Sequence, residues 1–230
     1  PLGKRRRQLQ YGTGIEIFEK RSFYSFVQCI KDGYVGYLRN NEITTKKISF
    51  THLVKSNLCH VYENPDIKSR ASMVLTLGAK VSVSGETKNF FKIDEGWIYK
   101  NNLSSKEKPY SQPLDVATSF LGAPYLWGGN SVLGIDCSGL VQLSCHMCGI
   151  KSAADSDLQE KSLGQSIELG QDYQRGDLLF WKGHVAWVSS PSQLIHATAF
   201  HMAVVVESLE EVFTRILKQG GGKPTSWRRL

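Results

Sequence analysis

The stretch YLWGGNSVLGIDCSGL, residues 125–140, decides the fold of this chain because it places a cysteine where a buried helix should begin. Asp136 is a favourable N-cap residue, and a mostly apolar run starts at Leu140 and continues until Gly149 supplies a stop. The pattern predicts that the helix starts at Cys137. Unpaired backbone N–H groups and the helix dipole are expected to lower the pKa of such a thiol toward neutrality, which would make Cys137 a nucleophile.

An arbitrary cysteine is more often a small buried hydrophobe than a nucleophile. Around Cys137, however, four glycines would let other backbone segments approach the sulfur closely: Gly128, Gly129, Gly134 and Gly139. This setting favours the reactive role for Cys137. The other close pair, Cys145 and Cys148, lacks the second pair that a zinc site needs, so packing is the simpler interpretation. The sequence therefore predicts neither a metal nor a cofactor.

A thiol nucleophile needs a base, and the base needs a partner that orients it. Residues 175–188, RGDLLFWKGHVAWV, predict two strands joined by a turn, with His184 opening the second strand. Residues 193–197, QLIHA, predict a neighbouring strand that carries His196. Together they indicate a Cys–His–His relay of the papain type, in which His201 competes with His196 for the third role.

The blocks that carry these residues resemble the motifs of the NlpC-type cell-wall cysteine peptidases, from about Pro113 to Leu230. The resemblance implies an α+β papain-like catalytic domain, with helices packed on an antiparallel sheet. It also implies that Cys137 is the nucleophile, His184 the base and His196 the third polar residue.

The N-terminal half has alternating apolar positions and an internal repeat, which predict two small all-β barrels. Residues 14–41 are echoed by residues 78–102 at a spacing of about sixty residues, and both copies resemble bacterial SH3 domains. A chain of 230 residues has room for such barrels before a catalytic domain. We expect SH3-like domains at 1–52 and 53–105, and the catalytic domain at 106–230.

Composition limits the partners and the compartment. Residues 1–55 hold eleven Lys and Arg against four Asp and Glu, whereas residues 111–230 hold nine against eleven. The basic run at residues 4–7 lacks an aromatic-interleaved groove, so we expect a solvated arm and no nucleic acid partner. The sequence has no run of eighteen apolar residues, so it predicts no membrane-spanning helix. Five cysteines, an odd number, favour a reducing cytoplasmic compartment, or a secreted or periplasmic one if the N-terminus was trimmed.

Two SH3-like domains before an NlpC-type domain resemble the subgroup that cleaves cell-wall peptides between γ-D-glutamate and a diamino acid. That resemblance implies peptidoglycan stem peptides with a free N-terminal L-alanine as substrate, and thus recycling of released peptides. It further implies that the first SH3 domain narrows the cleft. The oligomeric state is not indicated by the sequence, and a monomer is assumed.

The same resemblance assigns residues to the substrate. Tyr125 matches a tyrosine near the oxyanion, and Ser138 and Asp155 match residues that hold the free amine; the alternative for Asp155 is a solvent-facing helix cap. Two positions depart from the family pattern. Thr13 stands where an acidic residue is common, and Ala154 stands where an arginine is common. These departures affect fine specificity and not the type of reaction.

Two other functions compete with the peptidase. The same relay serves any acyl transfer, so a thiol-dependent amidase or acyltransferase is one alternative. A non-catalytic cell-wall-binding protein is the other, and loss of Cys137 or His184 would have been its sign in the sequence; both are present.

Overall fold

The computed structural model of the protein describes residues 3–45, 49–105, 109–168 and 172–230. The fold divides into two compact units: residues 1–5 with 9–107, and residues 108–230 with the short segment Arg6–Gln8. A three-residue piece of the N-terminal arm therefore belongs with the second unit.

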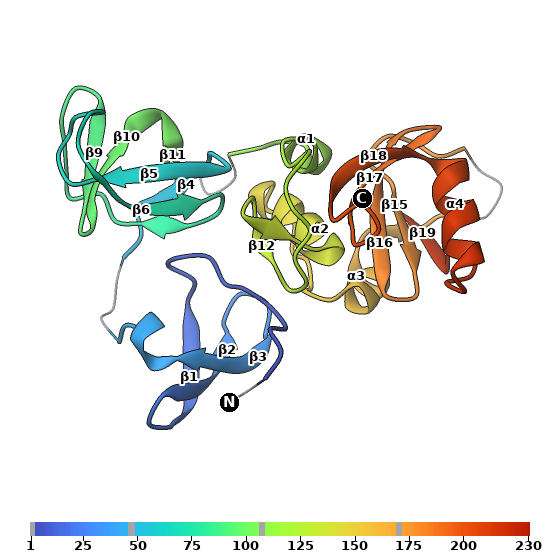
Figure 1. Cartoon of the computed structure of the whole chain (residues 1–230), viewed down its shortest axis with the longest axis horizontal. Helices are drawn as coiled ribbons and strands as arrows, with labels where there is room; N and C mark the ends of the chain where they lie inside the picture. The colour runs from blue at the N-terminus through green and yellow to red at the C-terminus, as the bar shows by residue number, and fades with distance from the viewer. Residues whose placement is uncertain (1–2, 46–48, 106–108, 169–171) are drawn as a thin grey trace. The chain divides into compact units, whose positions relative to one another are not determined.

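The first β-sheet has three antiparallel strands in the order β1-β2-β3 (Figure 1). They are β1 (Ile15–Lys20), β2 (Tyr24–Cys29) and β3 (Val35–Arg39), and the 3-10 turn η1 (Asn40–Glu42) follows. Along β2, burial alternates, so that Ser25, Val27 and Cys29 lie inside. This period of two is what a strand with one face in a core requires, and it confirms the first predicted β region.

The rest of the first unit contains a five-stranded sheet in the order β6-β5-β10-β9-β8 and a three-stranded sheet in the order β11-β4-β7. The strands are β4 (His52–Val54), β5 (Leu58–Tyr62), β6 (Ala71–Thr76), β7 (Lys80–Val81), β8 (Gly85–Glu86), β9 (Phe90–Ile93), β10 (Gly96–Tyr99) and β11 (Leu103–Ser104). Their inner faces form one apolar core, with Val61 and Ile98 fully buried. As in the first copy of the repeat, a three-residue 3-10 turn, η2 (Lys100–Asn102), follows the last long strand.

The second unit is an α+β domain built on a six-stranded sheet in the order β14-β19-β15-β16-β17-β18. Its strands are β14 (Gln165–Ser166), β15 (Leu178–Trp181), β16 (His184–Ser190), β17 (Gln193–Thr198), β18 (Ala203–Ser208) and β19 (Ser226–Arg229). A small hairpin of β12 (Asn130–Ser131) and β13 (Gly134–Ile135) precedes the cysteine-bearing helix. In the described residues, the paired strands of the large sheet are antiparallel, as predicted.

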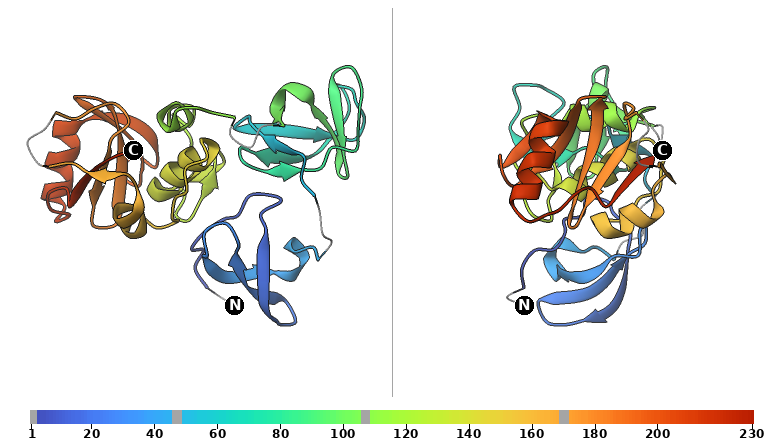
Figure 2. Two further views of the ribbon diagram at one scale, coloured as in Figure 1. Left: turned by 180° about the vertical axis from the view of Figure 1, so that it is seen from behind. Right: turned by 90° about the vertical axis from the view of Figure 1, so that its right-hand side faces the viewer.

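Four helices accompany this sheet within the described part of the second unit: α1 (Pro113–Thr118), α2 (Cys137–Met147), α3 (Ser156–Ser162) and α4 (Leu209–Lys218). Figure 2 shows α1 and α2 on one side of the sheet and α4 on the other. Leu209 and Val212 of α4 pack against Trp181 and its apolar neighbours on β15–β17. Across the described ranges, no helix is both long and apolar enough to cross a membrane.

A buried carboxylate fastens β19 to the turn before β15. Asp177 accepts hydrogen bonds from the Arg229 guanidinium and from the indole N–H of Trp227, each at 2.8 Å. Burial alone would raise the pKa of Asp177, but these donors and the charge of Arg229 hold the pKa below its usual value. Asp177 of the Arg-Gly-Asp stretch at residues 175–177 therefore has a structural role.

Candidate active site

Helix α2 begins at Cys137, as predicted, and Asp136 is its N-cap. One carboxylate oxygen of Asp136 accepts the backbone N–H of Gly139 at 2.7 Å, and the other accepts the N–H of Gly128 at 2.8 Å. The carboxylate thus ties the helix start to the glycine turn. A Cβ on Gly139 would lie 2.6 Å from the carbonyl oxygen of Gly129, so this close approach requires glycine.

The thiol of Cys137 is buried, and the backbone N–H groups of Val185 and Ser138 are close enough to lower its pKa. The effect of Val185 places the sulfur near the first residues of β16. Burial and the charge of Asp136 raise the pKa of the Cys137 thiol to about 12, and the backbone donors offset only part of this rise. The expected shift toward neutrality is therefore wrong in direction, because desolvation outweighs the helix start. The resting group is a thiol, and its reaction needs a base.

His184 opens β16, and His196 lies on the paired strand β17, so the sheet register brings both imidazoles together. Nε2 of His184 lies 2.8 Å from Nδ1 of His196. Burial is the largest cause that lowers the pKa of His184 to about 3, and the neighbouring His196 and Arg215 add to this effect. The imidazole of His184 is therefore neutral at ordinary pH. The neutral imidazole of His184 has a lone pair, so it can accept a proton.

His201 does not join this pair. Its Nε2 lies 3.0 Å from Oε1 of Glu207, and its side chain is 39% exposed. The hydrogen bond to His184 is made by His196, which is only 1% exposed. In the described structure, the position predicted for the third member of the relay is thus occupied by His196.

Sequence reasoning missed Glu207, near the end of β18. Its Oε2 accepts hydrogen bonds from Nε2 of His196 at 2.8 Å and from Nη2 of Arg215 at 2.7 Å. Its Oε1 accepts a hydrogen bond from Nη1 of Arg215. Burial alone would raise the pKa of Glu207, but hydrogen bonds from His196, Arg215 and His201 hold the pKa far below its usual range. A carboxylate after the apolar run at residues 203–206 was the only sequence sign, and it does not reveal the strand register.

Tyr125 lies in the segment between α1 and β12, where its backbone bridges to Ile135. Burial, followed by the nearby charges of Cys137 and Asp136, raises the pKa of the Tyr125 phenol to about 12. The hydroxyl therefore keeps its proton and remains a hydrogen-bond donor close enough to Cys137 for their charges to interact. The expected role of Tyr125 near the oxyanion stays a prediction.

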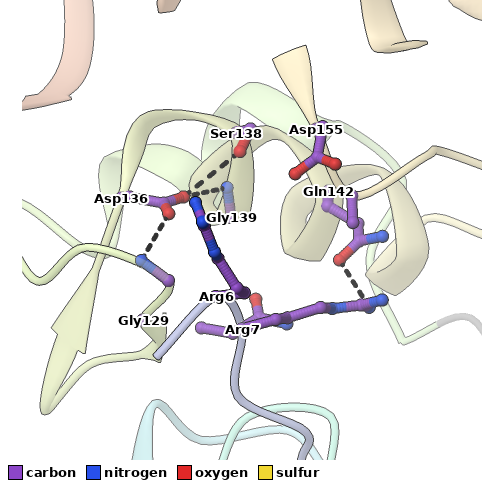
Figure 3. Close-up of a pocket in the computed structure, with 11 residues that line it drawn as sticks. Arg6, Arg7, Gly129, Asp136, Ser138, Gly139, Gln142 and Asp155 are labelled. Atoms are coloured by element: carbon purple, nitrogen blue, oxygen red, sulfur yellow. Dashed lines mark hydrogen bonds between the residues drawn. The ribbon is translucent and has the colours of Figure 1, made fainter. Parts of the chain in front are cut away.

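Ser138 and Asp155 line one pocket together with Asp136 (Figure 3). Ser138 donates to Asp136 at 3.3 Å. Asp155 is exposed and occupies the N-cap position of α3, as the alternative of a solvent-facing helix cap requires, although its side chain makes no capping hydrogen bond. Ala154 lines the same pocket, where it brings no charge of its own.

The pocket also contains two arginines from the N-terminal arm, Arg6 and Arg7. Figure 3 shows the Arg6 side chain extended toward Asp136 and Ser138, while Arg7 donates to Oε1 of Gln142 at 2.9 Å. A Cβ on Gly128 would lie 2.6 Å from the carbonyl oxygen of Arg6. The expected solvated arm is therefore wrong at Arg7, which is half-buried, although Lys4, Arg5 and Arg6 are exposed.

Comparisons with known proteins agree with this architecture. Residues 122–217 match the NlpC/P60 family, and residues 1–43 match the bacterial dipeptidyl-peptidase Sh3 domain. The chain thus carries an NlpC/P60 domain behind a bacterial SH3 domain, and it is a cysteine peptidase of the papain-like NlpC type. That family contains cell-wall peptidases.

Three bacterial dipeptidyl-peptidases are similar in sequence to this chain. Dipeptidyl-peptidase 6 of Lysinibacillus sphaericus is 25% identical over 89% of this chain and 84% of its own length. The gamma-D-glutamyl-L-lysine dipeptidyl-peptidases of Bacillus cereus and Bacillus subtilis are 25% and 26% identical, over 60% and 65% of their own lengths. This chain therefore spans less than two thirds of those two enzymes.

Among solved structures, an NlpC/P60 family protein from Bacillus cereus superposes with a TM-score of 0.80. The alignment covers 97% of this chain and 81% of that chain at 22% sequence identity. At this identity, the likeness shows the fold.

Proposed function

We propose that the protein hydrolyses the bond between γ-D-glutamate and a diamino acid in cell-wall peptides that have a free N-terminal L-alanine. The observation that carries the proposal is the pocket lined by Ser138 and Asp155, which adjoins the helix start that holds Cys137. A carboxylate and a hydroxyl suit an ammonium group. The names of the two Bacillus relatives, gamma-D-glutamyl-L-lysine dipeptidyl-peptidases, support the same substrate class.

The proposed reaction is acyl transfer through Cys137. Neutral His184 takes the thiol proton as the sulfur attacks the glutamyl carbonyl carbon, and the tetrahedral oxyanion accepts a hydrogen bond from the Tyr125 hydroxyl. The C–N bond then breaks, and the proton on His184 passes to the leaving amine of the diamino acid. Water, deprotonated by His184, attacks the thioester and restores the thiol.

The two departures from the family pattern have structural counterparts. The hydroxyl of Thr13 donates to the carbonyl oxygen of Gln10 at 2.7 Å, so this side chain is used in its own turn. Arg6 lines the pocket beside Ala154, so a cation enters the pocket from the N-terminal arm and not from residue 154. A substrate ammonium must therefore share the pocket with a guanidinium, which repels it.

The test is the product spectrum from L-Ala-γ-D-Glu-L-Lys and its meso-diaminopimelate analogue. We expect masses of the L-Ala-D-Glu dipeptide and the released diamino acid, and no such products with Cys137→Ala. Matched lipid ester and primary amide substrates test the acyltransferase and amidase alternatives. Turnover of those compounds without peptide cleavage would overturn the proposal.

A further inference from the structure

A buried carboxylate lies behind the two histidines of the candidate site. We propose that Glu207 is a positioning residue that fixes the tautomers of His196 and His184, and so keeps Nδ1 of His184 available as the base. The inference rests on the proposed thiol relay, but it does not depend on which acyl substrate the relay attacks.

The hydrogen-bond chain has one direction because its last member only accepts. An ionised carboxylate has no proton to donate, so Nε2 of His196, at 2.8 Å from Oε2 of Glu207, must be the donor. When His196 carries a single proton, that proton is therefore on Nε2, and Nδ1 has a lone pair that faces Nε2 of His184 at 2.8 Å. Nε2 of His184 must carry its proton, and Nδ1 of His184 is left as the acceptor.

The surroundings of Glu207 keep it ionised. Arg215 of α4 binds both carboxylate oxygens, and His201 approaches Oε1 from the loop before β18. Arg215 is itself held, because its guanidinium stacks over the ring of Phe200 at 4.4 Å. The groups around this carboxylate are therefore Arg215, His201 and His196, with His184 one step further along the chain. The hydrogen bonds from His196, Arg215 and His201 all favour the anionic form of Glu207.

The arrangement also accommodates the charge that develops during the reaction. When His184 takes the thiol proton, its Nε2–H bond to His196 strengthens, and His196 is in turn polarised by an anion 2.8 Å away. Without that anion, the positive charge would form in a buried site beside a second imidazole. Loss of Glu207 should therefore slow the chemical step more than it weakens substrate binding.

A merely structural role is the competing interpretation, since Arg215 and Glu207 also join α4 to β18. Glu207→Gln separates the two roles, because an amide keeps the shape but offers an N–H₂ group to Nε2 of His196. That donor would reverse the tautomer of His196, place a proton on Nδ1, and leave His184 with its proton facing Cys137. We expect kcat to fall roughly 10–100-fold with little change in KM, as for other residues that orient a functional histidine.

Two variants serve as controls. Glu207→Asp keeps an anionic acceptor and should recover much of the activity. His201→Gln removes another partner of the same carboxylate, at an exposed position, and should change kcat by less than about fivefold.

The direct readout is the nitrogen-15 NMR spectrum of the histidine rings, with the rate of Cys137 alkylation by iodoacetamide measured from pH 4 to 9. In the unmodified protein, both His184 and His196 should carry the proton on Nε2. Glu207→Gln should change the His196 tautomer and lower the alkylation rate across the pH range. Neither readout needs the peptide, so failure of peptide cleavage with the expected tautomers would reject the substrate and keep this inference.

A proton on Nδ1 of His196 in the unmodified protein would overturn the inference, whether or not any variant folds. Unchanged tautomers and kcat in a folded Glu207→Gln variant would overturn it equally.

Discussion

The histidine pair on the sheet and the pocket lined by Ser138 and Asp155 both adjoin the start of α2, yet they are built differently. The relay is formed by paired strands: His184, His196 and Glu207 come from β16, β17 and β18, and each is linked to the next by a 2.8 Å hydrogen bond. The pocket is lined by residues at the starts of two helices, by a glycine turn, and by Arg6 and Arg7 of the N-terminal arm. Sheet register therefore places the histidines and Glu207, whereas segments outside the sheet form the pocket that we propose for the substrate amine.

The electrostatics differ in the same way. In the relay, the anion at Glu207 is compensated by Arg215, and His184 is kept neutral by burial. In the pocket, burial raises the pKa of Asp136, backbone N–H groups partly offset the rise, and the charge of Asp155 adds to it. Carboxylates that repel one another in a partly open pocket form a site that gains from a bound cation.

The largest expected effect is at the thiol. Cys137→Ser should reduce turnover of the peptide by at least about a thousandfold, because a serine hydroxyl is a much weaker nucleophile at the same position. Cys148→Ser is the matched control, since that half-buried thiol lies at the far end of α2 and should be dispensable. Near-normal turnover by Cys137→Ser would reject the assignment of the nucleophile.

A smaller loss is expected on the sheet side of the comparison. His196→Ala should lower kcat roughly 10–100-fold, less than loss of His184, because it orients the base without taking the thiol proton. Steady-state kinetics of both variants beside His201→Ala provide the check. If His201→Ala were far more damaging than His196→Ala, the third member of the relay would be misassigned.

On the pocket side, the effect should be specific to the substrate amine. Asp155 is exposed in the absence of substrate, so solvent screens its charge and limits the effect of its removal. Asp155→Asn should reduce the preference for free over N-acetylated peptide by about tenfold, with alkylation of Cys137 unchanged. A variant that lost activity equally on both peptides would show a structural role for Asp155.

The smallest effect is expected at the arm. Because Arg6 is an exposed cation in the pocket, Arg6→Ala should lower KM for the free-amine peptide about two- to fivefold. Lys4→Ala, which removes an exposed charge from the same arm, is the control. A rise in KM for Arg6→Ala alone would mean that Arg6 binds an anionic group of the substrate.

These two regions also differ in how far the sequence predicts them. The N-cap at Asp136, the helix start at Cys137 and the strand opened by His184 follow from local patterns of a few residues. The role of His196 is harder to predict, because an apolar run with one histidine indicates a strand but not the strand with which it pairs. The β16–β17 pairing in the structure brings His196 to His184.

What the sequence did not show depends on long-range packing. Glu207 meets His196 only through the pairing of β17 with β18, and its charge depends on Arg215 from α4. Arg7 and Gln8 meet Gln142 and Asn130 more than a hundred residues away. The pKa of Cys137 was misjudged because a helix start can be recognised in a sequence, while the depth of burial cannot. The expected boundaries of the two SH3-like domains stay predictions.

The most direct test of the account is cleavage of paired substrates by the unmodified protein. L-Ala-γ-D-Glu-L-Lys and its N-acetyl form differ only in the charge and bulk at the amine that Asp155 and Ser138 should bind. Mass spectrometry should find rapid cleavage after γ-D-glutamate in the free peptide, and much slower cleavage in the acetylated one. Equal cleavage of both would contradict recognition of the amine while leaving the peptidase intact, and cleavage at another bond would contradict the proposed specificity altogether.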